Sequence, residues 1–461
     1  MHAASAGDRA NVRGRRLADY VVGARAGGRA LPPVVLNAAK RALVDFLGVT
    51  VGAVDEAPVR SVRGAVDAWH AAGKAQIFFG PRTTPALAVL VNATMTHAMD
   101  FDDTHPMGGG HPSGPCWSTA LAMAQEIDAD ETAVIAAFLA GYEVMAKLGG
   151  GGVPGVGRSL QRRGFHPTSM FGRMGAAVVA SVLLGLDENQ VQAALGVAAT
   201  TAGGLVGSFG TYSKPFHSGK AAMDGVLAAQ LAANGFMAAT HLYEREKGLL
   251  DAFIQDRVVE VPALDFDEKW EILDNAFKPF ASCRGTHPST QAARSLASRV
   301  ADRQIAEVRA QVHPGCLVTA GKPHPRTPLE GKFSVAFCIS LGLAGYEVVA
   351  PDFGDAAYND PRVQDILSKV HVTAIEGQAP YCAHLDVVMA DGERLHADTD
   401  IVLGHPDNPM SWDDLRTKFE GLAKPVLGPR KSADLFEAAR NFEQPGSLRK
   451  LMALLQPIER K

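Results

Sequence analysis

Residues 169–186, SMFGRMGAAVVASVLLGL, decide the class of fold. This stretch predicts an apolar helix that is rich in alanine and glycine. The next stretch, 187–204, predicts another helix with Asp187 as its N-cap. Small side chains let neighbouring helices approach closely. The pattern therefore favours a compact bundle in which all elements are helices.

Helical patterns extend on both sides of these two stretches. Further helices are predicted at 36–53, 85–100, 130–150 and 218–236. Pro85 stands in the first turn of the second of them, and Gly235 stands at the expected C-cap of the last. The N-terminal half of the chain is thus expected to be helical throughout.

The pattern changes near residue 295. Residues 302–315 alternate apolar and polar side chains, as a half-buried strand does. Residues 382–400 contain two alternating runs joined by an Asp-Gly pair, which predicts a β-hairpin. The intervening stretches 331–348 and 361–372 are predicted to be helical. This part of the chain therefore combines helices and strands.

The length of the chain indicates two domains, because 461 residues exceed one typical core. Helical periodicity returns from residue 410 onward. We therefore expect a mainly α fold. A large all-helical domain is built from both chain ends, 1–272 and 405–461, and residues 273–404 form a smaller α+β lid domain.

Charge and composition exclude some classes of partner. The net charge is −4, so no global basic field draws the protein to nucleic acid or to an anionic membrane. No stretch is expected to approach the roughly 20 apolar residues of a membrane span. Apolar residues make up 47% of the chain and charged residues 20%, which is typical of a soluble enzyme.

The cysteines and the N-terminus indicate a cytoplasmic protein. Five cysteines are scattered without a CxxC pair, which favours neither a disulfide framework nor a zinc–thiolate site. Residues 1–27 lack the apolar core of a signal peptide. The stretch 149–157 formally contains GxGxxG, but a predicted helix precedes it, which favours a linker over a dinucleotide-binding loop.

Residues 100–113, DFDDTHPMGGGHPS, pack three aspartates and two histidines around three glycines. All five side chains are metal-ligand types, but their spacing matches no recognised zinc or calcium loop. An Asp-rich helix end stabilised by local hydrogen bonds would explain one or two of the acids, but not two His-Pro pairs. Asp102 and Asp103 are expected to bond loop amides, and an acid–base role is favoured for the rest.

Three further segments place cations and histidines beside predicted helix starts, at 162–172, 211–222 and 277–293. Helix N-termini with nearby lysines attract anions. Such a pocket would hold a substrate with several carboxylates while an Asp or His removes a proton from the carbon next to one of them. The lysines would stabilise the enediolate-like charge, so neither a metal nor a cofactor is required.

The order and spacing of four segments resemble the MmgE/PrpD family. The segments are 97–114, 164–177, 213–229 and 278–293, and the likeness extends from about residue 15 to about residue 419. The family includes 2-methylcitrate dehydratase, cis-aconitate decarboxylase and iminodisuccinate epimerase. The resemblance implies a helical domain built from both chain ends, a smaller α+β lid, a pocket between them and a homodimer.

The resemblance also implies the site. The catalytic residues carried over from the decarboxylase branch are Asp100, His111, His166, Lys214 and Lys278. Thr104 carries over as a substrate contact, and Cys283 stands where that branch has a histidine, which argues against cis-aconitate decarboxylation. The predicted substrate-binding set is Thr104, Arg163, His217, Cys283 and His287.

The expected roles follow from the chemistry of these side chains. Asp100 or His111 is the general base, and the other orients the substrate or donates a proton. Lys214 and Lys278 bind carboxylates of a small polycarboxylate substrate, and His166 contacts the substrate or moves a proton.

The first functional hypothesis is a dehydratase-like lyase that removes a proton next to a carboxylate and then eliminates water. Epimerisation of an iminodisuccinate-like substrate and cis-aconitate-type decarboxylation stay open. The rival hypotheses are a metal-dependent hydrolase that uses the Asp/His loop, and a dimeric binding protein without catalysis.

Overall fold

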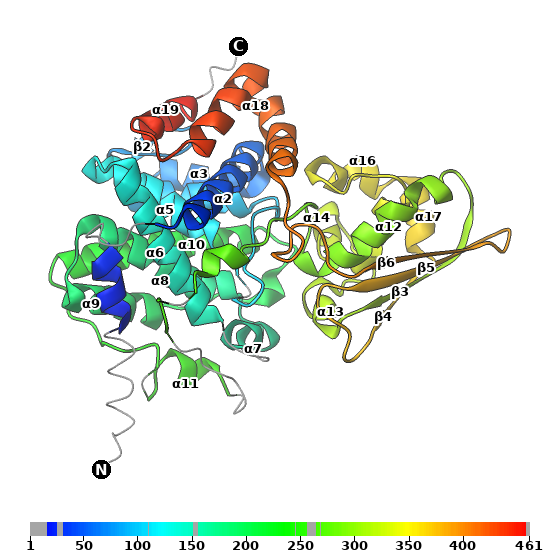
Figure 1. The fold of residues 1–461 in the computed structure, drawn as a ribbon, viewed down its shortest axis with the longest axis horizontal. Coiled ribbons are helices and arrows are strands. Elements are labelled where there is room, and N and C mark those ends of the chain that lie inside the picture. The colour runs from blue at the N-terminus through cyan, green and yellow to red at the C-terminus, as the bar shows by residue number, and fades with distance from the viewer. Residues whose placement is uncertain are drawn as a thin grey trace.

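A helical body and a smaller α+β part lie side by side in the computed structural model of the protein (Figure 1). The structure describes residues 16–24, 31–108, 110–150, 155–244, 246–255, 264–267 and 269–457. The predicted class, mainly α with a smaller α+β part, is confirmed. The GxGxxG stretch falls largely on residues 151–154, which lie outside the described residues.

The helical body is built from both ends of the chain. Its helices are α2 (Pro33–Gly52), α3 (Ala57–Asp67), α4 (Pro85–His97), α5 (Ser113–Ile127), α6 (Glu131–Gly149), α7 (Val156–Arg162), α8 (Pro167–Leu184), α9 (Glu188–Thr200), α10 (Ser213–Ala233), α11 (Leu249–Phe253), α18 (Trp412–Arg440) and α19 (Ser447–Leu454). Short strands β1 (Ala75–Gln76) and β2 (Arg82–Thr83) pair antiparallel, and 3-10 turns lie at η1 (Val206–Ser208) and η2 (Glu271–Asp274).

Helix α8 lies in the middle of the body, in contact with α5, α6, α9 and α10. A Cβ atom added at Gly141 on α6 would lie 2.6 Å from the carbonyl oxygen of Gly175 on α8. A Cβ atom added at Gly225 on α10 would lie 2.6 Å from the carbonyl oxygen of Arg173. Close packing through small residues is thus confirmed, and the predicted Asp187 cap forms a capping box at the start of α9.

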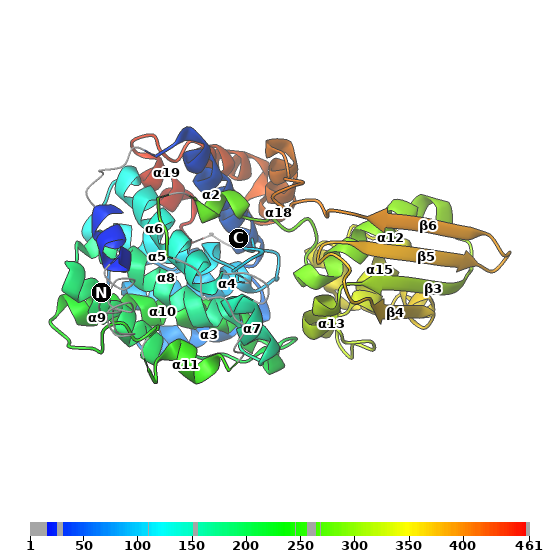
Figure 2. The same cartoon turned by 60° about the horizontal axis from the view of Figure 1, so that its bottom comes forward.

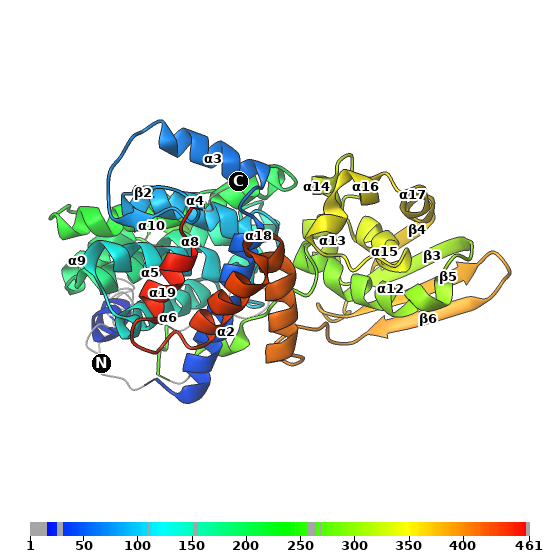
Figure 3. The ribbon, with the colours of Figure 1, turned by 90° about the horizontal axis from the view of Figure 1, so that it is seen from above.

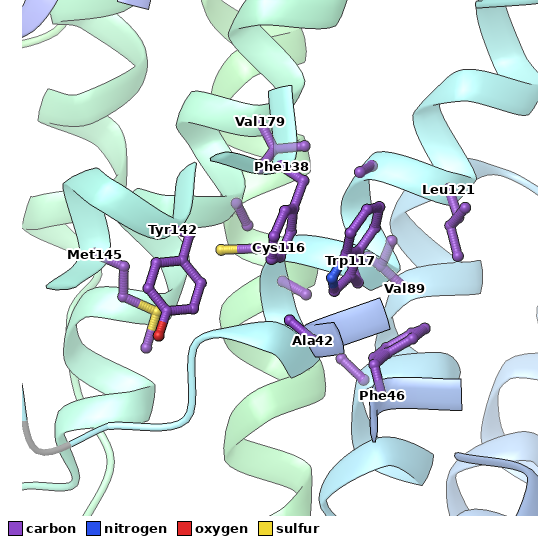
Figure 4. Packing of buried hydrophobic residues seen from close by; sticks show 14 of the residues in the cluster. Ala42, Phe46, Val89, Cys116, Trp117, Leu121, Phe138, Tyr142, Met145 and Val179 are labelled. Atoms are coloured by element: carbon purple, nitrogen blue, oxygen red, sulfur yellow. The ribbon is translucent and has the colours of Figure 1, made fainter. Parts of the chain in front are cut away.

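Aromatic side chains fill the space between the N-terminal helices. Trp117 stacks on Phe138 with ring centroids 3.9 Å apart, and Figure 4 shows Phe46 and Tyr142 near this pair. These side chains come from α2, α5 and α6 and are fully buried. They pack α5, which follows the polar loop, against α2 and α6.

The C-terminal helices pack on the N-terminal ones, as Figure 3 shows for α18 and α2. A Cβ atom added at Gly48 on α2 would lie 3.1 Å from the ring of Phe419, so glycine lets α18 approach. The limits drawn above for the two domains stay a prediction.

A four-stranded sheet and the helices beside it form the α+β part. The strands, in the spatial order β4-β3-β5-β6, are β4 (Val370–Ala374), β3 (Ile305–Val312), β5 (Ala383–Met389) and β6 (Arg394–Thr399). The helical segments are η3 (Arg284–Thr286), α12 (His287–Val300), α13 (Pro314–Ala320), α14 (Pro328–Gly331), α15 (Val335–Leu343), η4 (Ala350–Phe353), α16 (Asp355–Tyr358) and α17 (Pro361–Leu367). Figure 2 shows the three strands β3, β5 and β6 side by side.

The strand and hairpin predictions are confirmed. The helix predictions at 331–348 and 361–372 are wrong in part, since α15 covers only Val335–Leu343 of the first. Strands β5 and β6 pair antiparallel across the turn at Gly392, which has a φ of +89°. The predicted helix 361–372 ends at Leu367, and Val370 begins β4, which pairs parallel with β3. Pairing with a distant strand overrides the local helical pattern at this point.

Two helices of the core, α6 and α8, are long and apolar enough to cross a membrane by length and composition alone. The expectation that no stretch approaches a membrane span was therefore wrong in this respect. The apolar windows are 83% and 89% buried inside the fold, so packing in the protein core accounts for their composition.

Candidate active site

Three lysines clamp the loop that follows α4. Asp100 adopts a left-handed conformation with a φ of +54°, which is uncommon for a residue with a side chain. The carbonyl oxygens of residues 99, 100 and 101 each accept a hydrogen bond from a lysine Nζ, at 2.6, 2.7 and 2.7 Å. Lys332 of the α+β part bonds the carbonyl of residue 99, and Lys278 bonds that of residue 100. Lys418, which lies on α18, bonds the carbonyl of residue 101. Both parts of the fold therefore hold this turn in place.

The carboxylate of Asp100 is held by two ammonium groups. Its Oδ1 lies 2.7 Å from Nζ of both Lys214 and Lys278. Burial alone would raise the pKa of Asp100, but the two lysines hold this pKa well below its usual range. Among the described residues, the buried Oδ2 has no hydrogen-bond partner. Asp100 is thus ionised, weakly basic and able to accept one more hydrogen bond.

His97 links Asp102 to Lys214. Its Nε2 lies 3.1 Å from Lys214 Nζ, and its Nδ1 lies 2.8 Å from Asp102 Oδ2. Because an ammonium group can only donate, Nε2 accepts and the ring proton is on Nδ1. Burial lowers the pKa of His97 to about 3 against the pull of Asp102. His97 therefore positions its neighbours as a neutral imidazole.

His111 lies beside the same carboxylate. Its Nδ1 is 3.3 Å from Asp102 Oδ1, without the geometry of a hydrogen bond. Burial lowers the pKa of His111, while Asp102 acts to raise it. The pKa of Asp102 is well below its usual range because His111 and His97 outweigh its burial. A neutral histidine backed by an ionised carboxylate can accept a proton and return it.

The prediction that Asp102 and Asp103 bond loop amides is wrong for Asp102, which contacts two imidazoles. It is confirmed for Asp103, which accepts hydrogen bonds from the amide and hydroxyl of Ser113 and from Asn275 Nδ2. Burial raises the pKa of Asp103 to about 7. Asp103 thus secures the end of the loop.

A second pair of histidines faces the cluster. The Nδ1 atoms of His166 and His217 lie 3.2 Å apart, so one donates and the other accepts. Burial and the charge of Lys214 place the pKa of His166 well below its usual range and lower that of His217 to about 4. Both rings are therefore neutral beside the ammonium group.

Of three other predicted residues, His287 and Cys283 are buried and Arg163 is exposed. His287 is fully buried, donates from Nε2 to the carbonyl of Ser282 at 3.1 Å, and presents a lone pair at Nδ1. Cys283 is buried, and its amide donates to the carbonyl of Lys332. Arg163 is exposed at the C-cap of α7, and no contact among the described residues joins it to the cluster.

Three residues of the cluster were not predicted from the sequence. His97 stands at the start of segment 97–114, three residues before Asp100, and this proximity was a usable signal. Lys332 and Lys418 belong to distant segments, and nothing local marks them. Lys418 also pairs with buried Asp45 at 2.6 Å.

Buried lysines and free polar atoms gather in this cluster. The ammonium groups of Lys214 and Lys278 meet at the carboxylate of Asp100, and that of Lys332 bonds the carbonyl of the preceding residue, Met99. Such a buried site suits an anion.

Several buried atoms of the predicted site residues have no hydrogen-bond partner within the described part of the chain. They are Asp100 Oδ2, Thr104 Oγ1, His111 Nδ1 and His287 Nδ1. A buried polar atom without a partner costs about 1–3 kcal/mol, so a ligand that bonds these atoms would recover part of that free energy.

A metal ion is a less fitting occupant. His97, Asp100, Asp102 and His111 offer ligand atoms within 4.8 Å of one another. However, the Oδ1 atom of Asp100 already accepts from two ammonium groups, and Nε2 of His97 accepts from Lys214. A divalent cation would have to displace these lysines or bind beside like charges.

These residues lie at the junction of a helical body and an α+β part, and their lysines and free buried atoms suit an anion. The chain belongs to the MmgE/PrpD family: the model of the MmgE/PrpD N-terminal domain matches residues 15–262, and that of the C-terminal domain matches residues 280–444. The resemblance found in the sequence is thereby confirmed.

Similar curated proteins are cis-aconitate decarboxylases. The human protein (Homo sapiens) is 29% identical over 81% of this chain and 80% of its own length. The mouse protein (Mus musculus) is 27% identical over 85% and 83% of the two chains. The cis-aconitate decarboxylase-like protein oryM of Aspergillus oryzae is 25% identical over 92% and 94%.

Proposed function

We propose that this protein is a lyase that acts on a small tricarboxylate or dicarboxylate by moving a proton at a carbon next to a carboxylate. The observation that carries this proposal is a group of buried polar atoms without hydrogen-bond partners in and beside the lysine cluster. These atoms belong to Asp100, Thr104, His111 and His287. The names of the similar proteins support cis-aconitate as the first candidate substrate.

The low pKa of Asp100 indicates that this residue orients its neighbours and that another residue moves the proton. A carboxylate held by two lysines is a poor base, so Asp100 orients Lys214 and Lys278. His111 is neutral, is backed by Asp102, and moves the proton. The two lysines bind substrate carboxylates and stabilise negative charge that develops on the neighbouring carbon.

The two candidate reactions differ in the bond that breaks to form the negative charge. In decarboxylation, the bond to the leaving carboxylate breaks, CO₂ departs, and the electron pair stays on the carbon skeleton until a proton is added. In dehydration, a proton leaves the carbon first, and the electron pair then expels hydroxide from the adjacent carbon. Dehydration is the second candidate, because Cys283 stands where the resemblance to the decarboxylase branch implies a histidine.

A substrate panel tests the proposal. We expect purified protein to convert cis-aconitate or 2-methylcitrate, with products identified by proton NMR, and to leave malate unchanged. Citrate, itaconate and iminodisuccinate complete the panel, and conversion of iminodisuccinate alone would favour epimerisation. Unaltered substrates after long incubation, despite tight binding, would contradict the proposal and favour a binding protein.

Removal of metal should leave the activity unchanged. Two ammonium groups already occupy Asp100 Oδ1, so the proposed chemistry needs no divalent cation. The measurement is kcat before and after dialysis against EDTA. Activity that disappears with EDTA and returns with Mg²⁺, Mn²⁺ or Zn²⁺ would instead favour the metal-dependent hydrolase.

Lys332 should set an alkaline limit on substrate binding. Burial lowers the pKa of Lys332 to about 8, against the pull of Glu56 and Asp100 and with repulsion from Lys278 and Lys214. As the pH rises through this value, the site loses a positive charge, and we expect kcat/KM for an anionic substrate to fall.

The Lys332→Met variant should lack this alkaline limb, because it has no proton to lose there. Lys369→Met, at an exposed ion pair with Asp365, is the matched control and should keep the limb. An alkaline limb that persists unchanged in the Lys332 variant would assign it to another group. The predicted homodimer and cytoplasmic location stay predictions.

A further inference from the structure

Arg284 lies in η3, directly before α12, and within the described ranges only one of its guanidinium nitrogens has a protein acceptor. Its Nη1 donates to the carbonyl of Phe277 at 3.3 Å, and its guanidinium carbon lies 5.7 Å from the ring centroid of Tyr381. Its Nε and Nη2 are buried and have no hydrogen-bond partner in the part of the chain that the structure describes. These two nitrogens form one edge of the guanidinium.

A buried guanidinium edge without a carboxylate is costly, because the charge has lost water without gaining a partner. The nearby charge makes this worse. Burial lowers the pKa of Arg284 to about 10; Tyr381 acts to raise this pKa, and the positive charge of Arg158 acts to lower it. Arg158 belongs to α7, on the side of the helical body that faces α13 in Figure 2. The charge of Arg158 on the helical body therefore acts on Arg284 of the α+β part.

His287 connects this edge to the candidate active site. Its ring is buried, and the pKa of His287 is held well below its usual range by burial, then by the charge of Arg284, then by that of Lys278. Asp100 acts on the same ring in the opposite direction. Arg284 also donates to the carbonyl of Phe277, the residue before Lys278, and follows Cys283, whose amide donates to the carbonyl of Lys332. Arg284 is therefore a neighbour of the lysine cluster.

We infer that the free Nε–Nη2 edge of Arg284 binds a second carboxylate of the substrate, while Lys214 and Lys278 hold the carboxylate next to the reacting carbon. The two parallel N–H groups of such an edge match the two oxygens of a carboxylate. This inference rests on the proposed function and adds a preference for substrates with a distal carboxylate. Arg284 is accordingly a specificity-determining residue.

Two inert probes test the inference by direct binding. Propane-1,2,3-tricarboxylate carries three carboxylates, and methylsuccinate is the same skeleton without one terminal carboxylate. Isothermal titration of the full chain gives the ratio of their Kd values. We expect the wild type to prefer the tricarboxylate, and Arg284→Gln to lose at least about tenfold of that preference, the size expected for a hydrogen bond between charged groups.

A ratio separates recognition from folding, because a damaged fold weakens both probes alike. Arg284→Lys keeps the charge without the two-pronged edge and should recover only part of the preference. Arg303→Gln, which removes an exposed arginine paired with Asp391 and Glu393, is the control and should leave the ratio unchanged.

The outcomes distinguish this inference from the proposed function. An unchanged ratio in Arg284→Gln overturns the inference, even if the wild type turns over cis-aconitate. A ratio that collapses supports it, even if the wild type turns over no member of the panel. An unchanged ratio together with a shift of the variant from dimer to monomer would overturn it in favour of a carboxylate from a partner subunit.

Discussion

Asp100→Asn should lower kcat by on the order of 10³-fold, within the range found when a preorganised electrostatic contact of an active site is removed. The amide keeps the shape of the side chain but removes the charge that holds Lys214 and Lys278 at 2.7 Å. Two buried ammonium groups would then lack a carboxylate, and loss of such a partner destabilises a protein by about 3–5 kcal/mol. Steady-state kinetics and thermal unfolding measure the two effects.

The control for this variant is Asp365→Asn, which removes an exposed carboxylate on α17 that pairs with Lys369. It should leave kcat unchanged and shift the unfolding free energy by less than about 1 kcal/mol, as exposed ion pairs do. An Asp100 variant that unfolds at the normal temperature with full activity would show that the lysines do not depend on this carboxylate.

His111→Gln should lower kcat by about 10²–10⁴-fold, because it removes the group that moves the proton. In the wild type, the pKa of His111 is lowered by burial, so the ring stays neutral down to below its usual titration range. Activity should then fall at acid pH as His111 becomes protonated. The residual activity of the variant should lack this acid limb.

The same lowered pKa values affect stability. Histidines with a depressed pKa, such as His97 and His166, take up protons more readily in the unfolded chain, so the free energy of unfolding falls as the pH drops below about 6.5.

The matched control for His111→Gln is His371→Gln, at an exposed position on β4, which should change neither kcat nor the pH profile of kcat. An acid limb that survives in His111→Gln would assign the proton transfer to another residue.

Local patterns in the sequence predicted much of the fold. The alanine- and glycine-rich stretches form α8 and its neighbours, and the Asp-Gly pair forms the turn between β5 and β6. Such features depend on residues that are close in the chain. The strand β4 was missed because its pairing partner, β3, lies far away in the sequence.

The site was predictable where its residues lie in compact polar segments. Asp100, His111, His166 and Lys214 come together around shared contacts, directly or through His97 and Asp102. Lys332 and Lys418 could not be predicted, because only tertiary packing brings these distant residues to the carbonyls of residues 99 and 101.

Deuterium incorporation from D₂O tests the central claim most directly. The protein is freed of metal with EDTA and incubated with the polycarboxylate panel, and proton NMR follows the carbon next to each carboxylate. We predict deuterium at that carbon in product or recovered substrate, and its loss in Asp100→Asn and His111→Gln. No deuterium with any member of the panel, or exchange that is undiminished in both variants, would contradict the account.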